Sequence, residues 1–166
     1  MHVTDSFTYP AGLETVRTMA TNPQFVRSRL NFPGVEPAKI TVEERDADTV
    51  VHMTVTISET ALPDAARRFV KKGVSADVTE TWSPISDGTC HVTMDLSVQG
   101  APVTARALST LNDQGASTQR SVDADFHVKV PLIGKSIEQR AATRVSLLWK
   151  NEVRAAEKWL ADHPQD

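Results

Sequence analysis

The sequence predicts an α+β fold in which a seven-stranded, curved antiparallel sheet surrounds one long C-terminal helix. Apolar residues recur at helical spacing through Lys135–Asp162, which corresponds to a helix about 42 Å long. Six segments between Ala38 and Val130 alternate apolar and polar residues, the period of a strand. The stretch His2–Tyr9 alternates in the same way and predicts a seventh strand ahead of them.

Two short helices are predicted between the first strand and the rest of the sheet. Leu13–Ala20 has apolar residues at helical spacing, and Thr21-Asn22-Pro23 interrupts it because the residue before a proline avoids helical geometry. Pro23 suits the first turn of a second helix over Gln24–Leu30.

The other six strands are joined by tight turns, apart from a short helical or looped excursion at Leu62–Gly73. Clean alternation with short turns favours an antiparallel sheet with one covered face. The predicted strands span Lys39–Arg45, Val51–Ile57, Val74–Trp82, Cys90–Val98, the stretch from Val103 to the Asn112–Gly115 turn, and Gln119–Val130. One helix can cover seven strands only if the sheet curls around it, which leaves room for a small-molecule cavity between them.

Composition excludes several classes of protein. The chain of 166 residues predicts a single domain, 1–166, and its net charge of −3 argues against nucleic acid as a partner. No apolar run approaches the roughly 20 residues that span a bilayer, and the first residues lack the plan of a signal peptide. A single cysteine, Cys90, fits a reducing compartment, so we expect a cytoplasmic protein without integral membrane association. The oligomeric state is left open.

This order of elements resembles the helix-grip fold of the START/Bet v 1-like (SRPBCC) superfamily over essentially the whole chain. The segment Val128–Glu138 (VKVPLIGKSIE), leading into a helix with Trp149 and Trp159, is similar to the actinobacterial DUF2505 family, whose function is uncharacterised. The resemblance implies a hydrophobic ligand, such as a lipid, sterol or polyketide, between the sheet and the terminal helix. Some members of the superfamily are cyclases, and no catalytic motif comes with the resemblance.

No motif predicts a catalytic residue, a metal site or a cofactor. Strand parity places His2, His52, His91 and His127 opposite the apolar face, where scattered histidines are ordinary surface residues. Cys90 falls on the apolar face and is interpreted as a small buried hydrophobe, because a reactive thiol needs an electropositive, partly open setting.

Several charged side chains share the faces of the apolar residues: Asp5, Glu44, Glu80, Arg120, Glu138 and Glu152. Because an unpaired buried carboxylate is costly, each needs a partner, water or a raised pKa. Arg120 is the expected hub, with Glu80 and Glu138 as its partners. One interpretation is a structural ion pair, with Asp5 and Glu44 reaching solvent at strand ends. The other is that Arg120, Glu80 and Glu152 line a cavity and hold the polar end of a ligand.

The candidate ligand site follows from the residues on these inward faces. Trp82 and Trp149 lie near the middle of their elements and are the expected walls, although core packing is an alternative role. The candidate cavity residues are Glu80, Trp82, Met94, Arg120, Ala124, Phe126, Val145, Leu148, Trp149 and Glu152. Phe69 and Val70, within the basic segment Leu62–Gly73, are lid candidates, and a solvated basic helix or a docking patch are the alternatives for that segment.

Three functions remain open from the sequence. The leading hypothesis is a non-catalytic protein that binds a small hydrophobic or amphipathic ligand, lipid- or polyketide-like, under the terminal helix. The second is a cyclase or dehydratase in which Glu80 or Glu152, with a raised pKa, acts as general acid or base. The third is a protein-interaction module with a solid interior and an exposed apolar patch.

Overall fold

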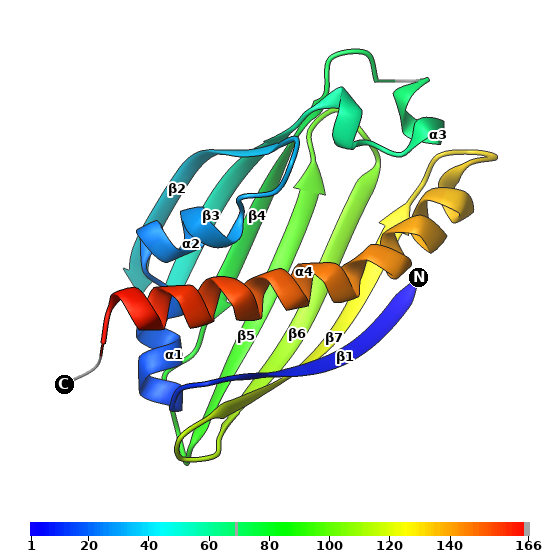
Figure 1. Cartoon of the computed structure of the whole chain (residues 1–166). Helices are drawn as coiled ribbons and strands as arrows, with labels where there is room; N and C mark the ends of the chain where they lie inside the picture. The colour runs from blue at the N-terminus through cyan, green and yellow to red at the C-terminus, as the bar shows by residue number, and fades with distance from the viewer. Residues whose placement is uncertain (69, 165–166) are drawn as a thin grey trace.

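The computed structural model describes residues 1–68 and 70–164, and it confirms the predicted architecture of a curved sheet crossed by one long helix (Figure 1). The strands are β1 (His2–Tyr9), β2 (Val35–Arg45), β3 (Asp48–Ile57), β4 (Val74–Trp82), β5 (Thr89–Val98), β6 (Val103–Asp113) and β7 (Thr118–Val128). The helices are α1 (Leu13–Ala20), α2 (Pro23–Arg29), α3 (Asp64–Arg67) and α4 (Gly134–Asp162), and a 3₁₀ turn, η1, covers Glu59–Ala61. None of the helices in the described ranges is long and apolar enough to span a membrane.

The seven strands form one antiparallel sheet in the order β1-β7-β6-β5-β4-β3-β2. All neighbours except β1 and β7 are consecutive in the chain, so hairpins and the β3–β4 excursion account for most of the topology. The first and last strands pair from His2–Asp125 to Tyr9–Thr118, which places the start of the chain beside the strand that leads into α4.

Most element boundaries agree with the sequence prediction, and the differences lie at strand and helix ends. The strand predicted from Lys39 begins at Val35, with an irregularity in its pairing between Pro37 and Lys39. The predicted turn at Asn112 starts later, because β6 continues to Asp113. Pro23 is the first residue of α2, and the side chain of Asn22 accepts a hydrogen bond from the backbone N–H of Gln24, a capping contact that sharpens the start of this helix.

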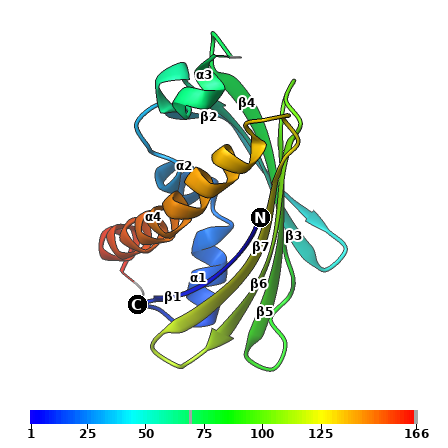
Figure 2. The ribbon, with the colours of Figure 1, turned by 90° about the vertical axis from the view of Figure 1, so that its right-hand side faces the viewer.

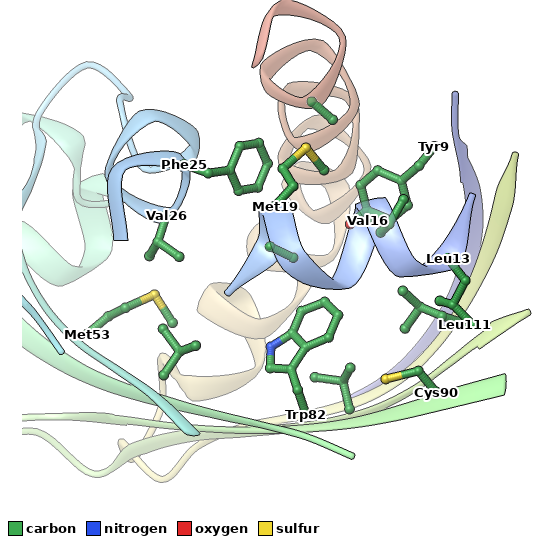
Figure 3. Close-up of a cluster of buried hydrophobic side chains, with 14 residues drawn as sticks. Tyr9, Leu13, Val16, Met19, Phe25, Val26, Met53, Trp82, Cys90 and Leu111 are labelled. Atoms are coloured by element: carbon green, nitrogen blue, oxygen red, sulfur yellow. The ribbon is translucent and has the colours of Figure 1, made fainter. Parts of the chain in front are cut away.

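The helices do not cover the inner face of the sheet evenly. α4 crosses the concave side of the sheet (Figures 1 and 2). The helices α1 and α2 lie beside the C-terminal half of α4, and α3 lies at the other end of the strands, near the start of α4. The main hydrophobic core lies under α1, α2 and the C-terminal half of α4. Figure 3 shows Trp82, Cys90 and Met53 projecting from the sheet toward Val16 and Val26 of the two short helices.

At the other end of the strands, inward-facing apolar side chains are incompletely buried. We call this region the half-covered face. It consists of residues at alternating inward positions of β4 to β7, each of intermediate exposure: Val78, Met94, Leu96, Val98, Val103, Ala105, Ala124 and Phe126. The half-covered face is therefore the part of the interior where a further apolar group could still be buried.

The junction between β7 and α4 is fixed by close backbone packing at Gly134. A Cβ atom at this position would lie 2.3 Å from the carbonyl oxygen of Val128, far inside a normal contact distance. At a helix position where a Cβ atom has space, replacing glycine by alanine stabilises the protein, because alanine loses less backbone entropy on folding. Here we expect Gly134→Ala to lower the free energy of unfolding by about 1–3 kcal/mol, the usual range for overpacking. Urea denaturation would measure this.

Ser136→Ala, two residues further along the exposed side of α4, is the matched control and should change stability little. Equal or greater stability of Gly134→Ala would show that the start of the helix can move away from β7 without cost.

Candidate functional site

Four charged side chains are buried between the sheet and the helices. Arg29 of α2 exposes 8% of its surface, Glu80 of β4 5%, Arg120 of β7 3% and Glu152 of α4 6%. Because burying an unpaired charge is far more costly than burying a paired one, the contacts among these four groups decide whether the interior can hold them.

Arg29 is the centre of this cluster. Its Nη2 donates to Oε2 of Glu80 at 2.8 Å, and its Nη1 donates to both carboxylate oxygens of Glu152, at 3.2 and 3.3 Å. Phe25, four residues earlier in α2, lies on the same helical face and is fully buried in the core, which directs Arg29 inward. One guanidinium thus joins α2 to the sheet and to α4.

Tyr9 extends the cluster from Glu152 to Arg120. The Tyr9 hydroxyl donates to Oε1 of Glu152 at 2.8 Å and accepts a hydrogen bond from Nη1 of Arg120 at 3.3 Å. At the other end, the indole Nε1 of Trp82 donates to Oε2 of Glu80 at 3.1 Å. The polar groups therefore form a continuous chain across the interior, from the middle of the sheet to β7.

The electrostatics of the cluster favour its charged form. Burial alone would raise the pKa of Glu80, but the charges of Arg29 and Arg120, with hydrogen bonds from Arg29 and Trp82, hold that pKa below its ordinary value. Burial would likewise lower the pKa of Arg29, and the charges of Glu152 and Glu80 outweigh it and raise that pKa. Burial and the charge of Glu152 raise the pKa of Tyr9, which keeps its hydroxyl protonated as a donor.

Arg120 differs from Arg29 in its surroundings. Its guanidinium carbon lies 5.4 Å from the ring centre of Trp82 and 5.9 Å from that of Phe7. Within the described residues its one hydrogen bond goes to Tyr9, and its buried Nε has no acceptor, a feature that it shares with the Nε of Arg29. Phe7 also stacks on Trp149, with ring centres 5.4 Å apart, and the enclosed indole Nε1 of Trp149 has no acceptor either. Two N–H groups are therefore unpaired around Phe7.

The structure corrects the predicted partners of Arg120. Arg29, not Arg120, contacts both buried carboxylates, so the expectation of Arg120 as the hub is wrong. Glu138 lies elsewhere: its Oε1 accepts a hydrogen bond from the backbone N–H of Val128 at 2.9 Å, and this bond lowers its pKa. The raised pKa proposed for Glu80 is also wrong, because Arg29 reverses the effect of burial.

The remaining predicted cavity residues fall into two groups. Trp82 is fully buried beside the ion-pair cluster, but it is the last residue of β4, so the expectation that it lies near the middle of its strand is wrong. The half-covered face includes Met94, Ala124 and Phe126, and Val145 and Trp149 of α4 are also half-buried. Leu148 is 45% exposed, so part of its side chain faces solvent. The role of these positions as ligand contacts remains a prediction.

Two surface hollows lie outside the predicted cavity. One of about 220 Å³ is lined by residues of α1, the start of α2 and Trp159 near the end of α4. The other, of about 560 Å³, is lined mainly by outward-facing residues of β4 to β7, among them Asp77, Asp95, Arg106 and His127. Neither supplies an enclosed volume under α4, so the cavity there is still a prediction.

Val70, one of the two lid candidates, lies at the end of the molecule that the half-covered face occupies. The excursion Leu62–Gly73 contains α3 as predicted, and α3 lies near α4 (Figure 1). Val70 is half-buried, and its backbone N–H donates to the carbonyl of Ala66 at 3.1 Å. Phe69 lies outside the described residues.

The other side chains considered for chemistry lie apart from the cluster. Asp5 is half-buried and accepts a hydrogen bond from the backbone N–H of Ser6, whereas Glu44 is exposed. On the outer face, His2 lies close to Asp123 and Asp125 in an exposed group whose ligand atoms could reach one metal ion. Cys90 is buried, as the sequence predicted, and burial raises the pKa of its thiol, which disfavours the thiolate form.

Sequence reasoning did not single out Arg29 or the hydroxyl of Tyr9. The signal for Arg29 was present, because it follows Phe25 and Val26 at helical spacing and therefore shares their buried side. Tyr9 is the last residue of the first predicted strand, but the hydrogen bonds of its hydroxyl depend on how α4 lies over β1, which periodicity does not specify.

Comparison with known proteins identifies relatives along almost the whole chain. The family model described as "Protein of unknown function (DUF2505)" matches residues 4–160. Uncharacterised proteins of Mycobacterium tuberculosis and Mycobacterium bovis are 22% identical over 164 residues, covering 93% of this chain and 94% of theirs.

Solved structures share the fold at low sequence identity. An aromatase/cyclase, Zhui, from a Streptomyces species has a TM-score of 0.61 at 12% identity, covering 99% of this chain and 96% of that one. A START superfamily protein from Mycobacterium smegmatis has a TM-score of 0.58 at 13% identity, covering 95% and 98%. At these identities the likeness establishes a START-like fold and leaves function to be argued from the residues.

Proposed function

We propose that this chain, which belongs to the DUF2505 family, binds a small hydrophobic or amphipathic ligand between the inner face of the sheet and α4. The observation that supports this most strongly is the half-covered face, where inward-pointing apolar residues such as Met94 and Phe126 keep part of their surface exposed. Burying apolar surface yields about 25 cal/mol per Å², so a ligand that completed this burial would gain affinity from it.

The site has a polar end as well as an apolar one. Along β7, Arg120, Ala124 and Phe126 occupy inward positions of one strand, so the half-covered face leads directly to the buried cluster. A few polar groups at one end of an apolar site fix the orientation of a ligand. This arrangement supports a lipid- or polyketide-like molecule with one polar end, and Val70 would then lie in a lid over the opposite end.

Ligand binding can be tested by filling the site. We expect Ala124→Trp to place a large side chain on the half-covered face and to weaken binding of the uncharged dye Nile red at least about tenfold, because the added ring occupies apolar volume. Dye fluorescence titration measures the effect, and native mass spectrometry of gently purified protein would reveal a co-purified apolar molecule.

Ser121→Trp is the matched control, because Ser121 is exposed on the same strand but on its outer face. It should leave dye binding unchanged. Equal binding by both variants, or no saturable dye binding by the unmodified chain, would contradict a ligand site on the inner face.

The two other hypotheses are weaker alternatives. A cyclase or dehydratase would need a carboxylate able to exchange a proton near neutral pH, whereas Arg29 holds Glu80 ionised and both carboxylates in ion pairs. A protein-interaction module is favoured by one observation, the exposure of Leu147 and Leu148 on α4 at 56% and 45%. If Nile red does not bind as expected, the protein-interaction module becomes the better-supported hypothesis.

A further inference from the structure

The buried charges of the cluster already balance one another. Two guanidiniums, Arg29 and Arg120, face two carboxylates, Glu80 and Glu152, and Tyr9 keeps its proton. A third carboxylate brought in by a ligand would leave the enclosed group with a net negative charge. Charge imbalance in a poorly solvated interior is strongly unfavourable, so the cluster disfavours an acidic ligand.

The cluster nevertheless has unused hydrogen-bond donors. Within the described residues the buried Nε of Arg29 and the buried Nε of Arg120 both lack an acceptor. The other donors of Arg29 reach both carboxylates, whereas Arg120 donates only one hydrogen bond, to the Tyr9 hydroxyl, so more of its donor capacity is unused. Nε1 of Trp149, across Phe7 from this region of the cluster, also lacks an acceptor. A buried donor without an acceptor costs about 1–3 kcal/mol, so an oxygen atom that reached these groups would relieve a penalty already present in the fold.

We propose that the polar end of the ligand is an uncharged oxygen acceptor, a carbonyl of the ketone, aldehyde or ester class, and that Arg120 binds it with Trp149 beside it. This inference rests on the proposed function and specifies its ligand class. The apolar part of the ligand lies along Ala124 and Phe126, on the same face of β7 as Arg120. An uncharged acceptor that pairs with Arg120 leaves the charge balance of Arg29, Glu80 and Glu152 undisturbed.

The test compares three molecules that share an eleven-carbon chain: 2-undecanone, undecane and undecanoic acid. Each displaces Nile red from the full chain at pH 7, and dissociation constants are derived from the loss of dye fluorescence. We expect the ketone to bind about tenfold or more tightly than both the alkane and the acid, since a hydrogen bond from a charged donor is worth about that factor.

Arg120→Met isolates the contribution of the guanidinium. We expect the ketone to bind this variant no better than the alkane, while the affinity for the alkane stays within about threefold of the original. Arg106→Met is the matched control, because Arg106 is exposed on the outer face of the neighbouring strand β6 and pairs there with Asp95. It should leave all three affinities unchanged.

The outcomes separate this inference from the proposed function. If all three molecules bind alike, or the acid binds most tightly, the carbonyl assignment is overturned while ligand binding stands. If neither the dye nor any of the three binds, the proposed function fails and the assignment fails with it. Should Arg120→Met lose its native circular dichroism spectrum, the ranking of the three molecules on the unmodified chain decides alone.

Discussion

Arg29→Met is expected to destabilise the protein more than any other single change considered for this site. It removes the guanidinium that contacts both Glu80 and Glu152 and leaves these two buried carboxylates with Arg120 as the one remaining cation of the cluster. Breaking a buried ion pair by removing one partner costs about 3–5 kcal/mol, a large share of the roughly 5–15 kcal/mol that stabilises a typical domain. Urea denaturation and thermal unfolding would measure the loss, and we expect the midpoint of thermal unfolding to fall by about 10 °C or more.

Two further variants show whether charge or packing is responsible. Arg27 lies on the exposed side of the same helix, so Arg27→Met is the matched control. It should change the free energy of unfolding by less than about 0.5 kcal/mol. Adding Glu152→Gln to Arg29→Met leaves Glu80 opposite Arg120 and restores the charge balance, so the double variant should recover part of the loss. A double variant less stable than Arg29→Met alone would contradict the electrostatic explanation.

The architecture was predictable from the sequence because it depends on periodicity. Alternation predicted the strands, and the prolines and turn residues placed their ends, with errors of a few residues at Val35 and Asp113. The apolar stripe of Lys135–Asp162 predicted α4, which begins one residue earlier, at Gly134. Strand order was not predictable from periodicity, since the pairing of β1 with β7 is a contact between distant segments.

The sequence predicted which residues lie in the site better than it predicted which of them contact one another. Strand parity placed Glu80 and Arg120 on the inner face, and helical position placed Glu152 there, and all three are buried. Parity does not fix distances, so Arg120 was assigned the carboxylate contacts that Arg29 makes from α2. Two charges on facing elements can pair only if the packing angle brings them together, and that angle is set by the core as a whole.

The stability contributed by Glu80 should depend on pH in a defined direction. Arg29 and Arg120 outweigh burial and lower its pKa in the folded state below the ordinary value of 4.5. A carboxylate with a lowered pKa stabilises the fold at pH values above its unfolded-state pKa, and this contribution is lost as the pH falls through the folded-state pKa. The part of stability due to Glu80 is therefore complete at pH 7 and declines below about pH 4.5.

Glu80→Gln tests this dependence with little change in shape. Arg29 and Trp82 both donate to Oε2 of Glu80, and the amide oxygen of glutamine can accept both bonds, so the substitution removes mainly charge. We expect it to lower the free energy of unfolding by about 3 kcal/mol at pH 7, the low end for a broken buried pair, as measured by urea denaturation. Because glutamine does not titrate, the difference in free energy of unfolding between the unmodified protein and Glu80→Gln should narrow as the pH falls from 5 toward 3.

Glu157 lies on the exposed side of α4, so Glu157→Gln is the control. Its free energy of unfolding should differ from that of the unmodified protein by less than about 0.5 kcal/mol at every pH. If the loss of stability in Glu80→Gln stays constant down to pH 3, the substitution destabilises the protein through geometry and not through the charge of the carboxylate. A loss that widens on acidification would mean that the folded-state pKa is raised, in which case Glu80 could serve as a general acid and the cyclase hypothesis would regain support. The pH dependence of this one substitution therefore decides between an ion pair that supports a binding site and a carboxylate poised for proton transfer.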